Sequence, residues 1–166
     1  MDPNTKRTVL RMIPYGLYVL TGESSSAVAA ATVNWVTQAS FAPPRVAVGG
    51  KADSGAHAVV KETGAFALNM LGKGQQAIAF TFFKTAEKQG GTISGEPYRA
   101  GSTGAPILTN LPAYVDCRLI ATVEKGDHSV FVGEVVDAGL TSAPAGRPDD
   151  AILWLKDLGE KTFYGG

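Results

Sequence analysis

Several residue types that define common protein classes are scarce in this sequence. Cys117 is the only cysteine among 166 residues, which excludes an internal disulfide framework and a metal site built from cysteines alone. Lysine plus arginine number 15, as do aspartate plus glutamate, so the chain lacks the excess of positive charge that nucleic-acid binding requires. We therefore expect no nucleic-acid partner, although this balance leaves room for a small local anion site.

Histidines and long hydrophobic runs are scarce as well. The two histidines do not form an H-x-x-x-H pair and no carboxylates cluster around them, so we expect no metal. No run approaches the roughly 18 apolar residues of a membrane helix. Residues 1–12 carry charges without the apolar segment of a signal peptide, so we expect a cytoplasmic protein with no membrane partner.

What the sequence does contain is a series of short apolar runs separated by turn residues. Hydrophobic residues make up 45% of the chain, which argues against disorder and gives a single domain, 1–166, enough core to fold. Twenty glycines and nine prolines indicate many turns. The patterns predict strands at 16–22, 27–36, 45–49, 65–71, 112–125 and 128–139, helices at 54–63 and 75–83, a long irregular stretch at 85–106, and short strands or a turn at 152–155 and 162–166.

This order of elements predicts a mainly β fold, a closed or nearly closed β-barrel with a few short helices. A strand–helix–strand unit occurs only once, around 45–71. The G-x-G-x-x-G fingerprint is absent, which argues against a Rossmann dinucleotide site.

The segment 32–40 gathers neutral polar side chains immediately before Pro43-Pro44. Amide and hydroxyl groups suit the edge of a planar, heteroatom-rich ring, and Trp35 would cover a ring face or shield it from water. The alternative is a polar edge strand with one core tryptophan. The candidate binding residues here are Thr32, Val33, Asn34, Trp35, Val36, Thr37, Gln38 and Ser40.

A second segment, 51–57, lies at the predicted start of a helix. The free N–H groups at a helix start and the helix dipole favour an anion, with a terminal phosphate as the natural guest. Lys51 and His57 would add charge, and Ser54 a hydroxyl. The alternative is an ordinary capped helix with an exposed lysine.

The third candidate is His128, which follows Asp127 in the turn of a predicted hairpin at 125–127. Asp127 would orient or charge-stabilise the imidazole, and the hairpin would hold it at the rim of the barrel. The alternative is a solvated turn residue. A serine hydrolase is not indicated, because the G-x-S-x-G elbow is missing.

Taken in order, these segments resemble the flavin reductase-like family of FMN-binding split barrels. The resemblance runs from about residue 16 to residue 136 and extends to 163–166. Its pieces are G-x-Y-V-L-T at 16–21, T-x-N-x-x-T-x-x-S at 32–40, K-A-D-S-x-x-H at 51–57, G-x-F-A-L-N-M-L at 64–71, G-A-P-I-L at 104–108 and G-D-H-x-x-F-x-G-E-V at 126–135. The last piece is the most specific.

The resemblance implies a homodimeric split β-barrel that binds FMN. It places 32–40 along the flavin ring edge, the phosphate at the start of the 53–63 helix, and His128 as the catalytic residue near the nicotinamide. The implied activity is hydride transfer from NADH or NADPH to the flavin, which then reduces an acceptor protein, free flavin or oxygen. Two alternatives are an FMN-holding electron-transfer module reduced by a protein donor and a flavin-binding protein without turnover.

Overall fold

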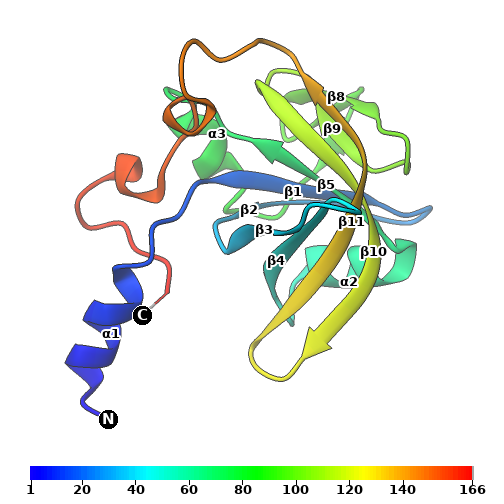
Figure 1. Cartoon of the computed structure of the whole chain (residues 1–166). Coiled ribbons are helices and arrows are strands. Elements are labelled where there is room, and N and C mark those ends of the chain that lie inside the picture. Colours follow the sequence, from blue (N-terminus) through cyan, green and yellow to red (C-terminus); the bar gives the residue numbers. More distant parts are fainter. Residues whose placement is uncertain (166) are drawn as a thin grey trace.

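A computed structural model describes residues 1–165, and its main body is an antiparallel seven-stranded sheet that curls into a barrel (Figure 1). The predicted mainly β barrel is confirmed. In spatial order the strands are β2 (Val28–Val33), β1 (Tyr18–Glu23), β5 (Ala65–Met70), β10 (Ala113–Glu124), β11 (His128–Leu140), β4 (Arg45–Lys51) and β3 (Val36–Ser40).

The interior of the barrel is filled by apolar side chains from strands that are far apart in the sequence. Leu20, Phe66, Leu68 and Phe131 pack in one cluster and are almost fully buried. Gly133 provides room for this packing, because a Cβ at that position would lie 2.5 Å from Cζ of Phe66. Burial of these side chains supplies the main driving force for closing the sheet.

The two predicted helices are confirmed. α2 (Gly55–Thr63) begins after Ser54, whose Oγ accepts a hydrogen bond from the N–H of His57 at 3.1 Å. It ends at Gly64, whose φ of +66° is the left-handed conformation that glycine adopts without steric strain. α3 (Gln76–Thr81) falls inside the predicted range 75–83.

The prediction of an irregular stretch at 85–106 is wrong. The region forms a second, four-stranded sheet of β6 (Lys88–Gln89), β7 (Thr92–Ile93), β8 (Glu96–Ala100) and β9 (Pro106–Leu108). Two of these strands have only two residues each, which is too short for an alternating pattern to be recognised. Gly90, Gly91 and Gly95 have positive φ and make the tight turns that join them.

One helix went unpredicted. α1 (Pro3–Arg11) is capped by Asp2, whose Oδ2 accepts from the N–H of Thr5 at 2.7 Å, and proline occupies its first turn. None of its residues is buried, and it projects from the barrel beside the C-terminal end of the chain (Figure 1). Among residues 1–165, no helix is long and apolar enough to cross a membrane.

The predicted single strand at 27–36 is also wrong, because the chain breaks at Asn34-Trp35. β2 ends at Val33 and β3 starts at Val36, whose N–H bonds back to the carbonyl of Asn34 at 3.1 Å. The carbonyl of Trp35 accepts from the N–H of Gly49 in β4 at 2.8 Å. A local turn and a neighbouring strand therefore satisfy the backbone at the break, where an amphipathic pattern alone predicts a continuous strand.

The C-terminal region follows the prediction only in part. Ile152 and Trp154 each form a single antiparallel bridge, to Gly72 and Gly16. Two 3₁₀ turns flank them, η1 (Pro148–Asp150) and η2 (Leu155–Leu158). We call residues 159–165 the C-terminal tail, and Gly166 of the predicted 162–166 segment lies outside the described residues.

Candidate functional site

A cavity of about 420 Å³, called here the main cavity, lies where β1, β2 and β4 meet the start of α2 and the C-terminal tail. Its walls are mostly apolar, with Leu17, Leu20, Phe131 and Leu155 among them. Six sequence-predicted residues line it: Thr32, Val33, Asn34, Lys51, Ser54 and His57. A mostly apolar cavity with a few convergent polar groups is the usual form of a small-molecule site.

One end of the main cavity combines a helix start with a lysine. The first N–H groups of α2 have no partner within the helix, and the positive end of the helix dipole lies with them. The Oγ of Ser54 donates to the carbonyl of Lys51 at 2.7 Å, which ties the strand end to the helix start. The ammonium of Lys51 lies 3.1 Å from Asp53 Oδ1 at the surface. The phosphate position at 51–57 stays a prediction, and the structure places Lys51, Ser54 and His57 together along the main cavity.

Asn34 supplies an amide to the cavity at the strand break. Its side chain is buried, and its Nδ2 lies a long 3.5 Å from the carbonyl of Tyr164. Such a long bond is weak, so the amide can pair with a heteroatom of a bound ring. Thr32 contributes differently, because its Oγ1 donates to the carbonyl of Ala79 at 2.7 Å and ties β2 to α3.

Four predicted residues, namely Val36, Thr37, Gln38 and Ser40, lie outside the lining of the main cavity as the described residues form it. They belong to β3, the edge strand of the large sheet, and Thr37 and Gln38 are exposed. The break at 34–35 carries these residues away from the cavity. As a ring-binding group they stay a prediction, and the structure gathers only 32–34 at the cavity.

Trp35 lies over the rim rather than in the cavity wall. Its ring centroid is 4.5 Å from that of His128 and 5.6 Å from that of Tyr164. Its Nε1 is buried and has no hydrogen-bond partner among the described residues. The indole thus holds the histidine and the C-terminal tail together.

His128 lies outside the described lining of the main cavity but contacts the lining residue Tyr164, and both of its ring nitrogens are engaged. Its place near the nicotinamide stays a prediction. Nδ1 lies 3.0 Å from Asp127 Oδ1 and Nε2 lies 2.8 Å from the hydroxyl of Tyr164. An ionised carboxylate only accepts, so Nδ1–H donates to Asp127, and this hydrogen bond holds the pKa of that carboxyl below its usual range. Burial raises the pKa of Tyr164, so its phenol stays protonated and can donate to Nε2.

His57 was predicted to add charge to an anion site, but its ring nitrogen Nε2 is engaged by neighbouring side chains. Its side chain borders the cavity but is buried, and its Nε2 lies 2.9 Å from Ser129 Oγ and 3.5 Å from Glu124 Oε1. The imidazole packs against Phe131 with ring centroids 5.1 Å apart. The histidine therefore fastens the start of α2 to β11.

The C-terminal tail is the part of the site that the sequence predictions missed. Thr162, Phe163 and Tyr164 line the main cavity. Gly165 has a φ of +106°, and a Cβ there would lie 3.2 Å from the Trp35 ring. The only sign of this role in the sequence is the aromatic pair Phe163-Tyr164 followed by Gly165. Without the fold, this pattern does not indicate which residues the tail contacts.

These features together fit a flat aromatic ring that carries an anionic group. Apolar side chains form the walls, Asn34 offers an amide, and the start of α2 with Lys51 offers positive charge. The backbone of Gly49 and Gly50 also lines the cavity, where a side chain would press on Trp35 or Phe131. No aspartate or glutamate is among the lining residues that the structure describes, and the carboxylate beside the cavity is Asp53, which pairs with Lys51 at the surface.

Comparison with known proteins agrees with this geometry. Residues 10–157 match the flavin reductase like domain family. A ferric-chelate reductase (NAD(P)H) of Archaeoglobus fulgidus is 34% identical over 130 residues, covering 76% of each chain. A flavin reductase of Pseudomonas putida is 29% identical over 157 residues, covering 94% of this chain and 88% of its own.

Solved structures give the same answer for the fold. The flavin reductase of styrene monooxygenase from Pseudomonas putida S12 superposes with a TM-score of 0.70 at 28% identity, covering 82% of this chain and 86% of its own. This likeness confirms the predicted split β-barrel. The chain belongs to the flavin reductase-like domain family.

Proposed function

We propose that the protein is an NAD(P)H-dependent flavin reductase that binds FMN in the main cavity. The observation that carries this proposal is the cavity itself, which joins apolar walls and the Asn34 amide to an anion site at the start of α2, with His128 beside it. The names of the relatives, a NAD(P)H ferric-chelate reductase and flavin reductases, support the same chemistry.

The residues of the cavity fit FMN in defined roles. Lys51, Ser54 and the first N–H groups of α2 would hold the phosphate, and Thr32 to Asn34 would lie along the ring edge. Phe131 and the leucines of the wall would exclude water from the ring. The bound flavin supplies the redox chemistry, accepting a hydride from the reduced nicotinamide and passing electrons on.

The chain itself positions and shields the reactants. His128, held by Asp127, would take a hydrogen bond from the nicotinamide carboxamide in place of the Tyr164 hydroxyl. Hydrogen-bond donors around the cavity would stabilise the negative charge that develops on reduction. No acid or base with a specially tuned pKa is needed for this role, since the protein contributes position and electrostatics.

We also propose that the chain acts as a homodimer and supplies reduced flavin to a partner enzyme. Val9 and Leu10 on the projecting α1 and Ile120 and Val123 on β10 are large apolar side chains that are 42–56% exposed. Exposed apolar groups on a helix that has no buried residues favour a second copy. The relative that reduces flavin for styrene monooxygenase supports the second half of the proposal.

The deciding experiment is anaerobic reduction of the FMN-loaded protein by NADH or NADPH, followed by stopped-flow absorbance. The wild type is expected to be reduced, and His128→Ala is expected to keep its FMN affinity while its reduction slows by roughly 5- to 150-fold, the worth of one positioning contact. Equal rates for the two proteins would remove His128 from the mechanism. A wild type that binds FMN but is reduced by neither nucleotide would point to the electron-transfer module instead.

A further inference from the structure

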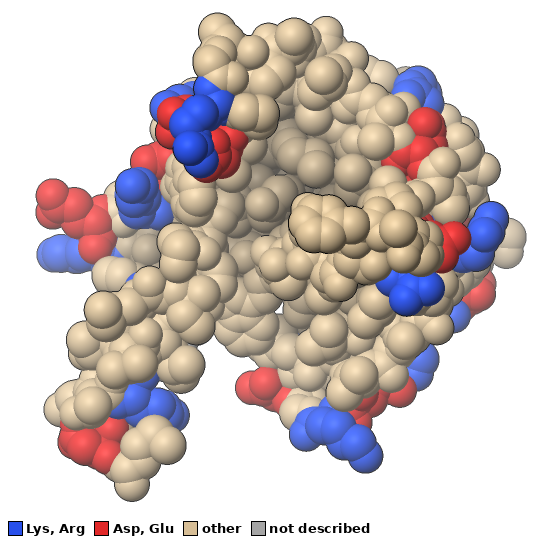
Figure 2. All heavy atoms as spheres, viewed as in Figure 1, with Lys and Arg blue, Asp and Glu red and all other residues tan. Residues whose placement is uncertain are grey.

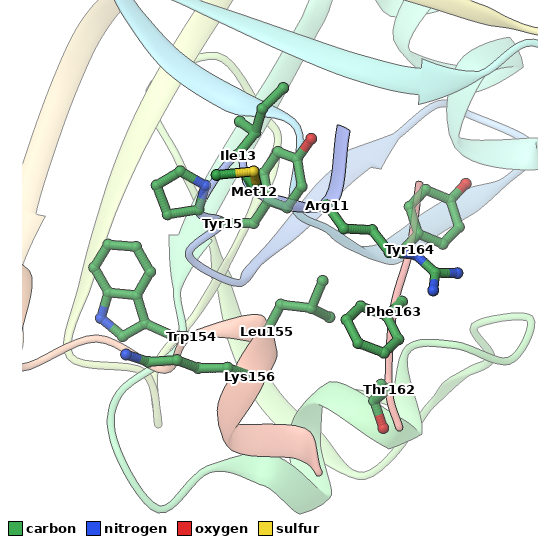
Figure 3. Close-up of a pocket in the computed structure, with 11 residues that line it drawn as sticks. Arg11, Met12, Ile13, Tyr15, Trp154, Leu155, Lys156, Thr162, Phe163 and Tyr164 are labelled. Carbon is green, nitrogen blue, oxygen red and sulfur yellow. The ribbon is translucent and has the colours of Figure 1, made fainter. Parts of the chain in front are cut away.

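A second cavity of about 400 Å³ lies between the end of α1 and the C-terminal tail (Figure 3). In Figure 2 the same face is hollowed beside the projecting helix and carries few charged side chains near its centre. The lining combines aromatic rings with positive charges, and the described lining residues include no aspartate or glutamate. The residues that matter are Tyr15, Trp154, Phe163, Tyr164, Arg11 and Lys156.

We propose that the second cavity binds an adenylate group, supplied either by NAD(P)H or by FAD. Adenine is flat and stacks on aromatic side chains, and its phosphates take charge-assisted hydrogen bonds from arginine and lysine. In the NAD(P)H case the proposal rests on the function proposed above and deepens it by assigning the site for the remote half of the reductant.

Arg11 is the residue best placed to meet a phosphate. It is the last residue of α1, and its guanidinium lies 4.2 Å above the Phe163 ring. Its Nε donates to the carbonyl of Gly165 at 3.4 Å, a bond that uses one of five N–H donors. Figure 3 shows Arg11 reaching toward the tail and Lys156 extending below the Trp154 ring on the opposite side.

The two cavities share a wall, which is what connects an adenylate to the reaction. Leu155, Thr162, Phe163 and Tyr164 line both cavities. The hydroxyl of Tyr164 reaches His128, while Phe163 next to it lies under Arg11. One ligand can therefore place a ring in the main cavity and its adenylate in the second cavity, with the tail between them.

The positive charges of Arg11 and Lys156 favour an adenylate in the second cavity over apolar side chains of a second copy of the chain. An apolar partner seated here would remove Arg11 and Lys156 from water without supplying a counter-charge, which is unfavourable. A phosphate supplies that counter-charge. The cations therefore favour the nucleotide, and the oligomeric state of the variants tests the other occupant.

The experiment uses the full-length protein and ligands that differ only in the adenylate. NADH is compared with reduced nicotinamide mononucleotide, and FAD with FMN, while 5′-AMP is titrated into the FMN-loaded protein by calorimetry. The variants are Arg11→Ala and Lys156→Ala. Arg7→Ala is the matched control, because it removes a cation one turn earlier on α1 whose side chain bonds Asn4 at 2.8 Å and lies outside the lining.

The expected result is that wild type binds 5′-AMP and that both variants weaken it roughly tenfold, while Arg7→Ala does not. If NAD(P)H is the source, both variants lower kcat/KM for NADH by about the same factor, and Lys156→Ala leaves kcat/KM for reduced nicotinamide mononucleotide unchanged. If FAD is the source, they weaken FAD and spare FMN. Arg11→Ala could weaken binding by loosening the tail. Lys156→Ala leaves the tail contacts of Arg11 intact, so a loss of affinity in that variant reports the removed charge alone.

Unchanged 5′-AMP binding in both variants, no 5′-AMP binding to wild type, or variants that shift only the dimer equilibrium would each overturn the proposal. Failure of the proposed function has a different signature, in which neither NADH nor the mononucleotide reduces the wild-type flavin. The 5′-AMP titration and the comparison of FAD with FMN decide the adenylate site even then.

Discussion

Removing the hydroxyl of Tyr164 is expected to make the protein a better reductase at low NADH. That hydroxyl lies 2.8 Å from Nε2 of His128, the atom that the proposed function assigns to the nicotinamide carboxamide. The nucleotide must therefore displace an existing hydrogen bond before it can make its own. A ligand that has to compete with an occupied state loses apparent affinity by the fraction of protein in that state.

The size of the effect follows from that single bond. A hydrogen bond between neutral groups contributes about 0.5–1.5 kcal/mol net, which corresponds to about 2- to 12-fold in affinity. Tyr164→Phe keeps the ring against Trp35 and removes only the hydroxyl. We expect KM for NADH to fall by that factor, with kcat and FMN affinity nearly unchanged.

Steady-state kinetics at saturating FMN and varied NADH measure the change. Tyr114→Phe is the control, because its hydroxyl also makes hydrogen bonds, to Arg99 at 2.8 Å and Asp137 at 3.1 Å, but lies outside both cavities. An unchanged KM would show that the hydroxyl does not limit access. A KM that rises would show that Tyr164 holds His128 in the productive orientation, and the competition argument would be refuted.

Two further outcomes follow from the geometry. Lys51→Ala is expected to weaken FMN binding about tenfold and riboflavin binding less than twofold in fluorescence titrations, because only FMN carries the phosphate. Lys61→Ala, at an exposed lysine, is the control. Equal losses of affinity for FMN and riboflavin would place the anion site elsewhere. Burial raises the pKa of the Cys117 thiol to about 12, so it is expected to resist iodoacetamide at pH 8 in the folded protein and to react once the chain is unfolded, as mass spectrometry would show.

Local patterns predicted the parts of this fold that are set by local physics. The capped helix from Ser54 to Gly64 and the hairpin of β10 and β11 carry their own start, stop and turn signals. The same kind of signal was present for α1, where Asp2 precedes Pro3, but those residues lack an apolar face that packs on the barrel. The two large apolar residues of α1, Val9 and Leu10, are adjacent, so the segment shows no stripe at helical spacing.

The residues of the candidate site also fall into those set by local sequence signals and those set by tertiary contacts. The presence of Lys51 and Ser54 at one end of the main cavity was predictable, because both lie at the helix start that their own sequence specifies. The ring end was predictable only as far as Asn34, since the break after it depends on the hydrogen bond from Gly49 to Trp35, which is a tertiary contact. The tail was out of reach for the same reason, as its hydrogen-bond partners His128, Asn34 and Arg11 lie 36, 130 and 154 positions away in the sequence.

The C-terminal tail is held in place by three separate parts of the protein. Arg11 on α1 donates to the carbonyl of Gly165, Trp35 packs against the Gly165 backbone, and His128 on the hairpin meets the Tyr164 hydroxyl. The two contacts of Gly165 depend on its φ of +106°, a backbone conformation that is strained for a residue with a side chain. The helix that projects from the barrel is therefore connected, through two residues of the tail, to the histidine at the rim. A ligand that engages Arg11 acts on the same tail that covers His128, so binding at the second cavity and access to the main cavity are expected to be linked.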